Sequence, residues 1–366
     1  MNQSKIKILY IIPSLASGGA EKFILDLINN LNHDIFEIKL LSFNGGGFFE
    51  EEFIKSNVDF KILKKRFKFD VYNFYQICRE IKNFSPDIVH TQLGGDIYGK
   101  IAAKFLRVKI IISTEQNVLD NDNFIIRFFK RITAKFSDRI IVISNSVKQD
   151  VICRYGIKED KVSLIPNGIN CDFLNDSDKK IKDAPFVFGS IGRLNEQKNF
   201  SLLIDALSFF KDKNFLCLIV GEGELRSKLE NKISNLCLSD KVKLLGTKKD
   251  VFSFLSSLDF FVLPSKWEGL GIVLLEAGLA KLPVLASATG GILDIIDDKR
   301  TGILFENNNL EDLKEKLEYF FDEKNKEVLA DLGGNLNKKI KENFDIKIIS
   351  QKYSDLYLSF LRDDKN

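Results

Sequence analysis

Two glutamates stand eight residues apart in the segment Pro264–Gly278, which reads PSKWEGLGIVLLEAG. Glu268 falls in a turn-forming stretch, and Glu276 falls about five residues into the helix that should follow. Both carboxylates accept hydrogen bonds, so they suit the hydroxyl groups of a neutral polyol such as a ribose. Glycines between them allow close backbone approach, and N–H groups at a helix start can face an anion. The residues after the first glutamate are, in order, Gly269, Leu270 and Gly271.

Two cations come from a second loop, GRLNEQKN, which follows a predicted strand at 186–192. Arg193 offers a forked pair of donors and Lys198 a point charge, so together they suit a diphosphate. Each charge-assisted bond would contribute about 1.5–3 kcal/mol. A pair of solvent-exposed cations is the alternative. Taken alone, the two cations favour that alternative; taken together with the glutamate pair, they suit a pocket for a nucleotide-sugar.

Short β-branched and aromatic runs alternate with helical patterns along the whole chain, which predicts an α/β fold with parallel sheets. A length of 366 residues favours two domains. In the first half we expect strands at 7–12, 38–43, 59–63, 87–91, 109–114 and 139–144. In the second half we expect them at 186–192, 215–220, 241–245, 259–263, 283–286 and 302–305. Their continuous apolar character is typical of strands buried on both faces.

Four motifs in this order resemble one family, the retaining glycosyltransferases of family 4. They are GGAE at 18–21, GRLNEQK at 192–198, LIVGEGE at 218–224 and EGLGIVLLE at 268–276. The resemblance implies the GT-B fold, with two facing Rossmann-like domains and a C-terminal helix that crosses back to the first. We therefore expect an acceptor-side domain at 1–165 that includes the helix 345–366, a linker at 166–185, and a nucleotide-sugar domain at 186–344.

The same resemblance assigns roles to the candidate residues. It implies that Gly18 and Gly19 line the phosphate and sugar end of the donor. Arg193 and Lys198 would neutralise the leaving diphosphate, as a metal does in other glycosyltransferases. Glu268 would lie at the transferred sugar, which makes it the third catalytic candidate. Donor binding would also involve Glu276 as the ribose contact. The turn between the two glutamates would contribute Gly269, Leu270 and Gly271. No cofactor and no metal are expected.

Two further candidates end predicted strands on the acceptor or sugar side. His90 closes DIVHTQ, where a lone histidine is either structural or a sugar contact. Gln116 lies in STEQN, at a position where the family often has a histidine. Glutamine can hydrogen-bond a sugar but cannot move a proton, so this departure bears on mechanism and activity.

The composition predicts a soluble globular chain with 45% hydrophobic and 29% charged residues. No apolar stretch reaches the roughly 18–20 residues of a membrane span. Five scattered cysteines suit a reducing cytosol, and two histidines make a zinc site unlikely on numbers alone. Two Asp-x-Asp triplets, at 120–122 and 176–178, resemble metal-binding motifs, but such triplets are common by chance.

Positive charge is concentrated in the first half of the chain. Residues 1–165 contain 25 Lys+Arg against 19 Asp+Glu, and the remaining residues contain 29 against 32. This imbalance indicates either that the first half contacts an anionic surface or acceptor, or that it is chance variation in a lysine-rich sequence. The segment FIIRFFKRITAKF at 124–136 is an amphipathic helix with a basic face. It would lie on an anionic membrane or pack into the core with its basic face solvated, and we favour the core. KKRFKF at 64–69 is a second candidate for surface contact.

The sequence thus predicts a metal-independent, retaining transferase. It would move a hexose-type sugar from a nucleotide diphosphate sugar, most simply a UDP-sugar, to a glycan or lipid-linked acceptor in cell-surface polysaccharide synthesis. We expect it in the cytoplasm, with peripheral contact to the cytoplasmic face of an anionic inner membrane and no nucleic-acid partner. The alternatives are a nucleotide-sugar epimerase on the same fold and a non-catalytic nucleotide-sugar-binding scaffold.

Overall fold

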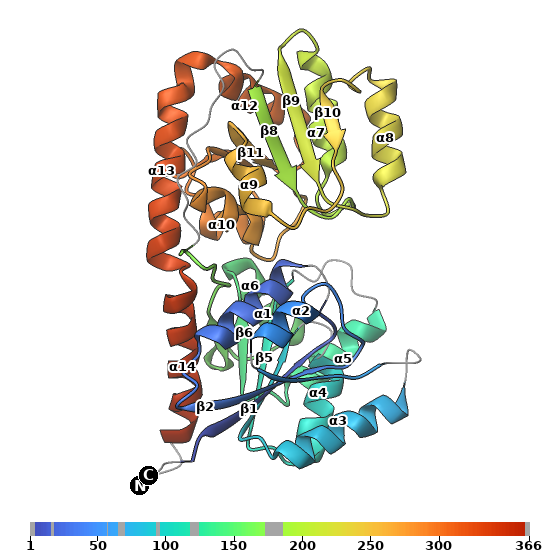
Figure 1. Cartoon of the computed structure of the whole chain (residues 1–366), viewed down its shortest axis with the longest axis vertical. Coiled ribbons are helices and arrows are strands. Elements are labelled where there is room, and N and C mark those ends of the chain that lie inside the picture. The colour runs from blue at the N-terminus through green and yellow to red at the C-terminus, as the bar shows by residue number, and fades with distance from the viewer. Residues whose placement is uncertain are drawn as a thin grey trace. The chain divides into compact units, whose positions relative to one another are not determined.

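The protein is described by a computed structural model that covers 4–15, 18–56, 58–64, 70–92, 96–117, 124–172 and 186–362. It divides into two compact units (Figure 1). The first consists of 1–170 and 346–366, and the second of 171–345. Most of the predicted linker, and both Asp-x-Asp triplets, lie outside the described residues. So does the KKRFKF segment except for its first lysine.

The first unit is built on a seven-stranded parallel sheet in the order β3-β2-β1-β4-β5-β6-β7. Its strands are β1 Ile6–Ile12, β2 Phe36–Ser42, β3 Asp59–Ile62, β4 Ile88–Gln92, β5 Ile110–Glu115, β6 Arg139–Val142 and β7 Val162–Leu164. The six strands predicted for this half are confirmed. Strand β7 was not predicted.

Helices cover both faces of this sheet. They are α1 Gly19–Asn30, α2 Glu50–Lys55, α3 Val71–Phe84, α4 Asp96–Phe105, α5 Phe124–Ala134, α6 Asn145–Tyr155 and the C-terminal α14 Ile346–Arg362. Successive side chains of β1 point to opposite faces. Ile8, Tyr10 and Ile12 therefore pack with α1 and α14, whereas Leu9 and Ile11 pack with α3 and α4. The central strand is buried on both sides, which explains its continuous apolar sequence.

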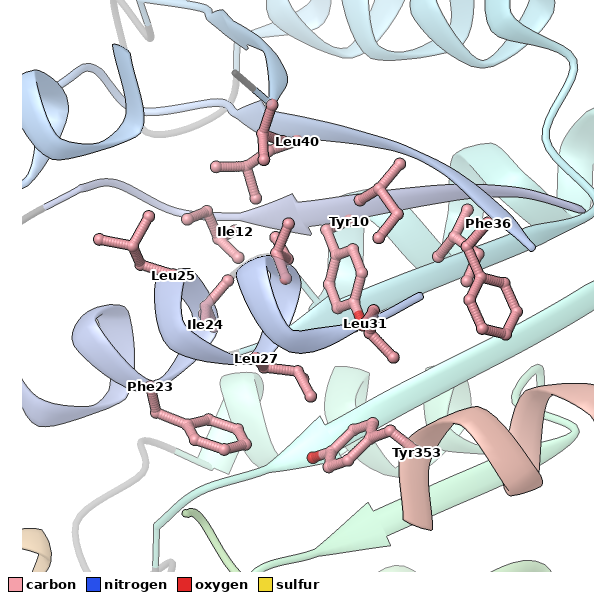
Figure 2. Close-up of a cluster of buried hydrophobic side chains, with 14 of the residues drawn as sticks. Tyr10, Ile12, Phe23, Ile24, Leu25, Leu27, Leu31, Phe36, Leu40 and Tyr353 are labelled. Atoms are coloured by element: carbon pink, nitrogen blue, oxygen red, sulfur yellow. The ribbon is translucent and has the colours of Figure 1, made fainter. Parts of the chain in front are cut away.

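The C-terminal helix α14 packs on the first unit, as predicted, through two buried tyrosines (Figure 2 shows Tyr353 beside the α1 residues). The Tyr357 hydroxyl lies 2.6 Å from that of Tyr10 and 2.7 Å from His90 Nδ1. The other ring nitrogen, Nε2, lies 2.7 Å from Thr114 Oγ1. A neutral imidazole has one donor and one acceptor nitrogen, so both match a hydroxyl partner. Burial lowers the pKa of His90 to about 3 and raises the pKa of the Tyr10 and Tyr357 hydroxyls.

The second unit has a six-stranded parallel sheet in the order β10-β9-β8-β11-β12-β13. Its strands are β8 Phe186–Ile191, β9 Phe215–Val220, β10 Val242–Leu244, β11 Phe260–Leu263, β12 Val284–Ser287 and β13 Ile303–Phe305. Its helices are α7 Phe200–Leu207, α8 Arg226–Asn235, α9 Val251–Ser256, α10 Ile272–Leu279, α11 Ile292–Ile295, α12 Leu310–Phe321 and α13 Lys326–Asn343. All six strands predicted for this half are confirmed.

In both sheets the order of strands reverses beside the first strand. In the second unit the chain moves outward from β8 through β9 to β10, then returns to β11 on the other side of β8. Strands β1 and β4 have the same relation in the first unit. The loops at the carboxyl ends of such a strand pair diverge and leave room for a ligand. The fold thus predicts one binding edge in each unit.

The predicted burial of the aromatic face of α5 is wrong. Phe128 is 53% exposed, Phe129 44% and Ile132 39%. The helix instead faces inward with small side chains, since Thr133 and Ala134 are each 1% exposed. No helix in the described ranges is long and apolar enough to cross a bilayer.

We expect the buried, neutral His90 to make stability depend on pH. The histidine of the unfolded chain binds a proton below its ordinary pKa of 6.5, whereas in the folded state the pKa is about 3. Between those values the unfolded state binds more protons, so the free energy of unfolding falls as pH falls, by at most about 1.4 kcal/mol per pH unit. Urea unfolding measured between about pH 6.5 and pH 4.5 should show this slope, and His90→Gln should reduce it. Equal slopes for the two proteins would contradict the assignment.

Candidate functional site

The loops that carry the predicted cations and the first glutamate lie at the binding edge of the second unit. Arg193 and Lys198 follow β8, and Glu268 follows β11, the strand that pairs with β8 at the reversal. These two loops are far apart in sequence, and the strand order alone makes them neighbours. The fold therefore brings the two motifs together.

Backbone and side-chain hydrogen bonds join the two loops directly. The Lys266 N–H donates to the Gln197 carbonyl at 2.8 Å, and Gln197 Nε2 donates to the Trp267 carbonyl at 3.1 Å. Lys266 Nζ also pairs with Glu196 at 3.1 Å. Since these bonds fix the spacing of the loops, they fix the spacing of the functional side chains on them.

An ion pair connects two of the predicted site residues. Lys198 Nζ lies 2.5 Å from Glu268 Oε1, and the Ser265 hydroxyl donates to the same oxygen at 2.7 Å. The side chains of the pair are only 15% and 6% exposed. The stem of Lys198 lies over Gly192, where a Cβ would stand 2.9 Å from it. The ammonium is thus held in one place by packing on one side and by a carboxylate on the other.

Glycines from other loops support both site loops from behind. A Cβ on Gly221 would lie 1.9 Å from the Gly192 carbonyl oxygen, and one on Gly223 would lie 2.4 Å from that of Leu194. Gly221 also has φ +141°, a conformation that other residues rarely adopt. The GEG turn after β9 therefore has a structural role, which is to let the cation loop pack against it.

The glycine pair after β12 supports the glutamate loop in the same way. A Cβ on Gly290 would lie 2.2 Å from the Glu268 carbonyl oxygen, and one on Gly291 would lie 2.1 Å from that of Gly269. The Gly291 N–H donates to the Glu268 carbonyl at 3.1 Å. Three loops, after β8, β11 and β12, form one hydrogen-bonded framework.

Helix α10 begins at the other end of the glutamate motif. Gly271 caps it with φ +88°, which favours glycine, and the Leu270 side chain is buried. Glu276 is the fifth residue of the helix and is half-buried. The helix places Glu276 one turn beyond the Gly269–Gly271 segment, as the sequence predicted.

The other predicted residues belong to the first unit. Gly18 caps α1 and Gly19 begins it, directly beyond the carboxyl end of β1. His90 is fully buried, with both ring nitrogens engaged by Tyr357 and Thr114. This location favours the structural interpretation of His90 over a sugar contact.

Gln116 also has partners for its amide group. Its Oε1 accepts from Asn167 Nδ2 at 2.9 Å, and its Nε2 donates to Gln92 Oε1 at 3.2 Å. All three side chains are buried. One N–H and one lone pair of the Gln116 amide remain for a further partner, but the side chain is buried between its two neighbours.

Sequence reasoning missed the residues that hold the site together. Ser265, Gln197 and the glycine pair 290–291 were not recognised as its supports. The Ser-x-x-Glu spacing of Ser265 and Glu268, which is typical of reciprocal capping, was an available signal. The hydrogen bonds of Gln197 depend on strand order and have no local signature. No cluster of metal-ligating side chains occurs within the part of the chain that the structure describes.

Two family models match the chain, one for each half. The model described as "Glycosyltransferase Family 4" matches residues 17–173, and "Glycosyl transferases group 1" matches residues 173–343. The chain is a GT-B glycosyltransferase. The two binding edges described above are therefore the edges of a two-domain glycosyltransferase.

Two relatives match this glycosyltransferase along almost its whole length. The UDP-Gal:alpha-D-GlcNAc-diphosphoundecaprenol alpha-1,3-galactosyltransferase of Escherichia coli is 27% identical over 98% of both chains. A Campylobacter jejuni enzyme named as an alpha-1,4-N-acetyl-D-galactosaminyltransferase acting on a diNAcBac-PP-undecaprenol glycan is 28% identical over 95% of this chain and 97% of its own.

Solved structures share the fold of this glycosyltransferase. A glycosyltransferase from Rickettsia africae has a TM-score of 0.84 and 24% identity, with coverage of 98% of this chain and 99% of its own. Anabaena HepE in complex with UDP-glucose has a TM-score of 0.84 and 20% identity, with coverage of 97% and 100%.

We expect the close approach at Gly291 to be essential for the framework of loops. Gly291→Ala forces a methyl group against the Gly269 carbonyl and should lower the free energy of unfolding by about 1–3 kcal/mol. Gly334→Ala is a matched control, because a Cβ there meets nothing within 4 Å and lies in a helix. It should leave stability unchanged or raise it by up to about 1 kcal/mol. Urea unfolding measures both, and a Gly291 variant as stable as the control would contradict the packing role.

Proposed function

We propose that this enzyme transfers a hexose-type sugar from a UDP-sugar to a lipid-linked or growing glycan acceptor, with retention of anomeric configuration and without a metal. The observation that carries this proposal is the paired loop framework, in which Lys198 and Glu268 form an ion pair at the binding edge and the exposed Arg193 stands on the same loop as Lys198. Support comes from the names of the E. coli and C. jejuni relatives, which act on undecaprenol-linked glycans, and from the UDP-glucose bound by HepE.

In this proposal the cation loop binds the diphosphate. Arg193 is exposed on a loop that Gly221 and Gly223 hold from behind, so its guanidinium can reach a ligand without moving the backbone. Lys198, on the same loop, is already held in place by Gly192 and Glu268. Groups that are in place before the reaction need little reorganisation as charge grows on the leaving group, which makes them effective in the transition state.

The glutamate motif binds the hydroxylated parts of the donor. Glu276 would accept hydrogen bonds from the ribose, and the Gly269–Gly271 segment would offer N–H groups to the phosphates. Glu268 would face the transferred sugar after Lys198 turns to the diphosphate. The sugar then receives a carboxylate that the Ser265 hydroxyl already orients.

The first unit would serve the acceptor. We propose that 1–165 with 345–366 form the acceptor-side domain and 186–344 the donor domain, with 166–185 as the linker. Gly18 and Gly19 begin α1 at the carboxyl end of β1, where they would approach the phosphate and sugar end of the donor. Gln116 would meet a sugar hydroxyl through the N–H or lone pair that Asn167 and Gln92 leave unused.

For the chemical step we propose attack by the acceptor hydroxyl on the face that the leaving group departs from. The acceptor oxygen forms a bond to the anomeric carbon as the bond from that carbon to the phosphate oxygen breaks. The acceptor's proton passes to the departing phosphate oxygen, so no protein nucleophile is required. This step needs only charge stabilisation on the diphosphate, which Arg193 and Lys198 supply.

The location of His90 argues against the epimerase alternative. An epimerase must remove and return a sugar proton, which requires an acid or base with a suitable pKa. Burial lowers the pKa of His90 to about 3, and both of its ring nitrogens are occupied. Gln116 cannot transfer a proton at all.

We expect substitutions in the cation loop and in the glutamate motif to affect different kinetic constants. Arg193→Ala removes a donor whose bond strengthens as charge develops, so kcat should fall by about 10²–10³-fold. Glu276→Gln weakens a ribose contact made equally in ground and transition states, so it should mainly raise the donor KM. Arg300→Ala, at another exposed arginine of the second unit, is the matched control and should change neither. Small, equal effects of all three on kcat/KM in folded protein would place the pocket elsewhere.

We also expect activity to persist in EDTA, because in this proposal Arg193 and Lys198 neutralise the diphosphate. UDP release in the presence of a lipid-linked acceptor measures this, with and without the chelator. Complete loss of turnover that manganese restores would overturn the proposed neutralisation by Arg193 and Lys198.

A further inference from the structure

The exposed surface of α5 combines large apolar and basic side chains. We define the α5 patch as Phe128, Phe129, Arg131, Ile132 and Lys135, all of which are exposed. On a helix, residues three or four apart are neighbours, so Phe128 adjoins Arg131 and Ile132. Lys135 follows in the turn that ends the helix, where its N–H donates to the Ile132 carbonyl at 3.2 Å. Apolar and basic side chains thus share one exposed surface.

This patch does not result from poor packing of the helix. Thr133 and Ala134 are fully buried, and the Thr133 hydroxyl bonds back to the Phe129 carbonyl at 2.9 Å. Helix α5 also packs beside α4 and α6. The helix is therefore docked through its small residues, and its aromatic side points to solvent.

The charge of the segment that carries the patch has one sign. Residues 124–137 include four basic and no acidic residues. The second unit offers a contrast in Phe209, which is 58% exposed, but Lys314 Nζ lies 3.9 Å from its ring centre. Carboxylates, including Glu311 and Glu315, line the same pocket. An anionic surface would be attracted to α5 and repelled from the surroundings of Phe209.

The aromatic side chains of the patch lie closer than its basic side chains to the side of the first unit where a ligand is expected. Four residues separate the end of helix α5 from the start of β6, so the last turn of the helix and Lys135 lie near the amino end of that strand. Phe128 and Phe129, in the middle of the helix, are therefore nearer to the carboxyl edge of the sheet. Ligands bind beyond that edge in doubly wound sheets.

We propose that the α5 patch docks the enzyme on an anionic lipid bilayer. The aromatic rings and Ile132 enter the headgroup region, while Arg131 and Lys135 contact the phosphates of anionic lipids. Basic side chains suit this position because their stems lie along apolar surface while their charges stay in water. The patch would hold the acceptor edge near a lipid-linked glycan, and in that respect it rests on the proposed function.

Flotation of the purified full-length protein with vesicles tests the proposal. Vesicles of phosphatidylglycerol and phosphatidylcholine should carry the protein upward at about 0.1 M salt and release most of it at about 1 M, where electrostatic screening is much stronger. Vesicles of phosphatidylcholine alone should carry little. Equal binding to both vesicle types would overturn the electrostatic part of the proposal.

Two paired variants assign the binding to α5. The double change Arg131→Gln with Lys135→Gln should weaken the vesicle partition constant roughly 25-fold, or about fivefold per cation. Phe128→Ser with Phe129→Ser should weaken it by about tenfold or more. The controls are Lys338→Gln, at a side chain that is 76% exposed, and Phe209→Ser, and both should bind like the unchanged protein. All these positions are exposed, and circular dichroism checks that each variant folds.

Two other outcomes would overturn the docking role. If the controls lose binding as much as the α5 variants, the attraction is not located at α5. If sedimentation shows that the phenylalanine change abolishes self-association while vesicle binding is absent, the patch binds a second copy of the chain instead.

Binding of UDP by calorimetry separates this proposal from the proposed function. All four variants should retain it, because none touches the loops after β8 and β11. Retained UDP binding without vesicle binding would contradict only the docking role. Vesicle binding that depends on α5, in a protein that binds no UDP and transfers no sugar, would contradict only the proposed function.

Discussion

The ion pair between Lys198 and Glu268 depends on the close approach of two loops that are separated by 70 residues. That approach is possible because β8 and β11 are neighbours at the reversal of strand order. Glycines make the approach closer, because without a side chain they can pack directly against the backbone carbonyl groups of the two loops. A larger residue at Gly221 or Gly291 would push a site loop away from its support. The positions of the functional side chains are therefore set by backbone packing behind them.

The first unit uses its binding edge differently. Polar side chains at the ends of β4 and β5 are buried and bonded to one another or to residues distant in sequence. His90 bonds to Tyr357 of the C-terminal helix, and Gln116 bonds to Asn167, which follows β7. A buried polar group without a partner would cost about 1–3 kcal/mol, so these bonds help to select one position for the segments that they join. Such polar residues thus serve assembly in the first unit, whereas under the proposed function those of the second unit serve the donor.

The sequence was sufficient to predict most strands because they are largely apolar runs with turn residues at their ends. The loops with Arg193, Lys198 and Glu268 were placed correctly since each follows such a strand directly. The orientation of α5 was not predictable in this way. Its periodicity shows two faces, but an aromatic face beside a basic face does not tell which one meets the sheet. Small residues at 133 and 134 decided it, and only tertiary packing reveals that. His90 is a similar case, because its partner Tyr357 is 267 residues away.

The ion pair also has a consequence for ligand selection under the proposed function. When Lys198 turns to a diphosphate, Glu268 loses its cation and keeps only the bond from Ser265. A buried carboxylate with too few hydrogen bonds is unfavourable. A ligand that supplies only phosphate therefore binds less tightly than its attraction to Lys198 would suggest. A ligand that brings phosphate and sugar hydroxyl groups together replaces both partners at once. This exchange of partners would favour binding of a complete nucleotide-sugar over binding of the nucleotide that remains after transfer. Once the sugar has left, Glu268 can pair with Lys198 again, and this would promote release of the nucleotide.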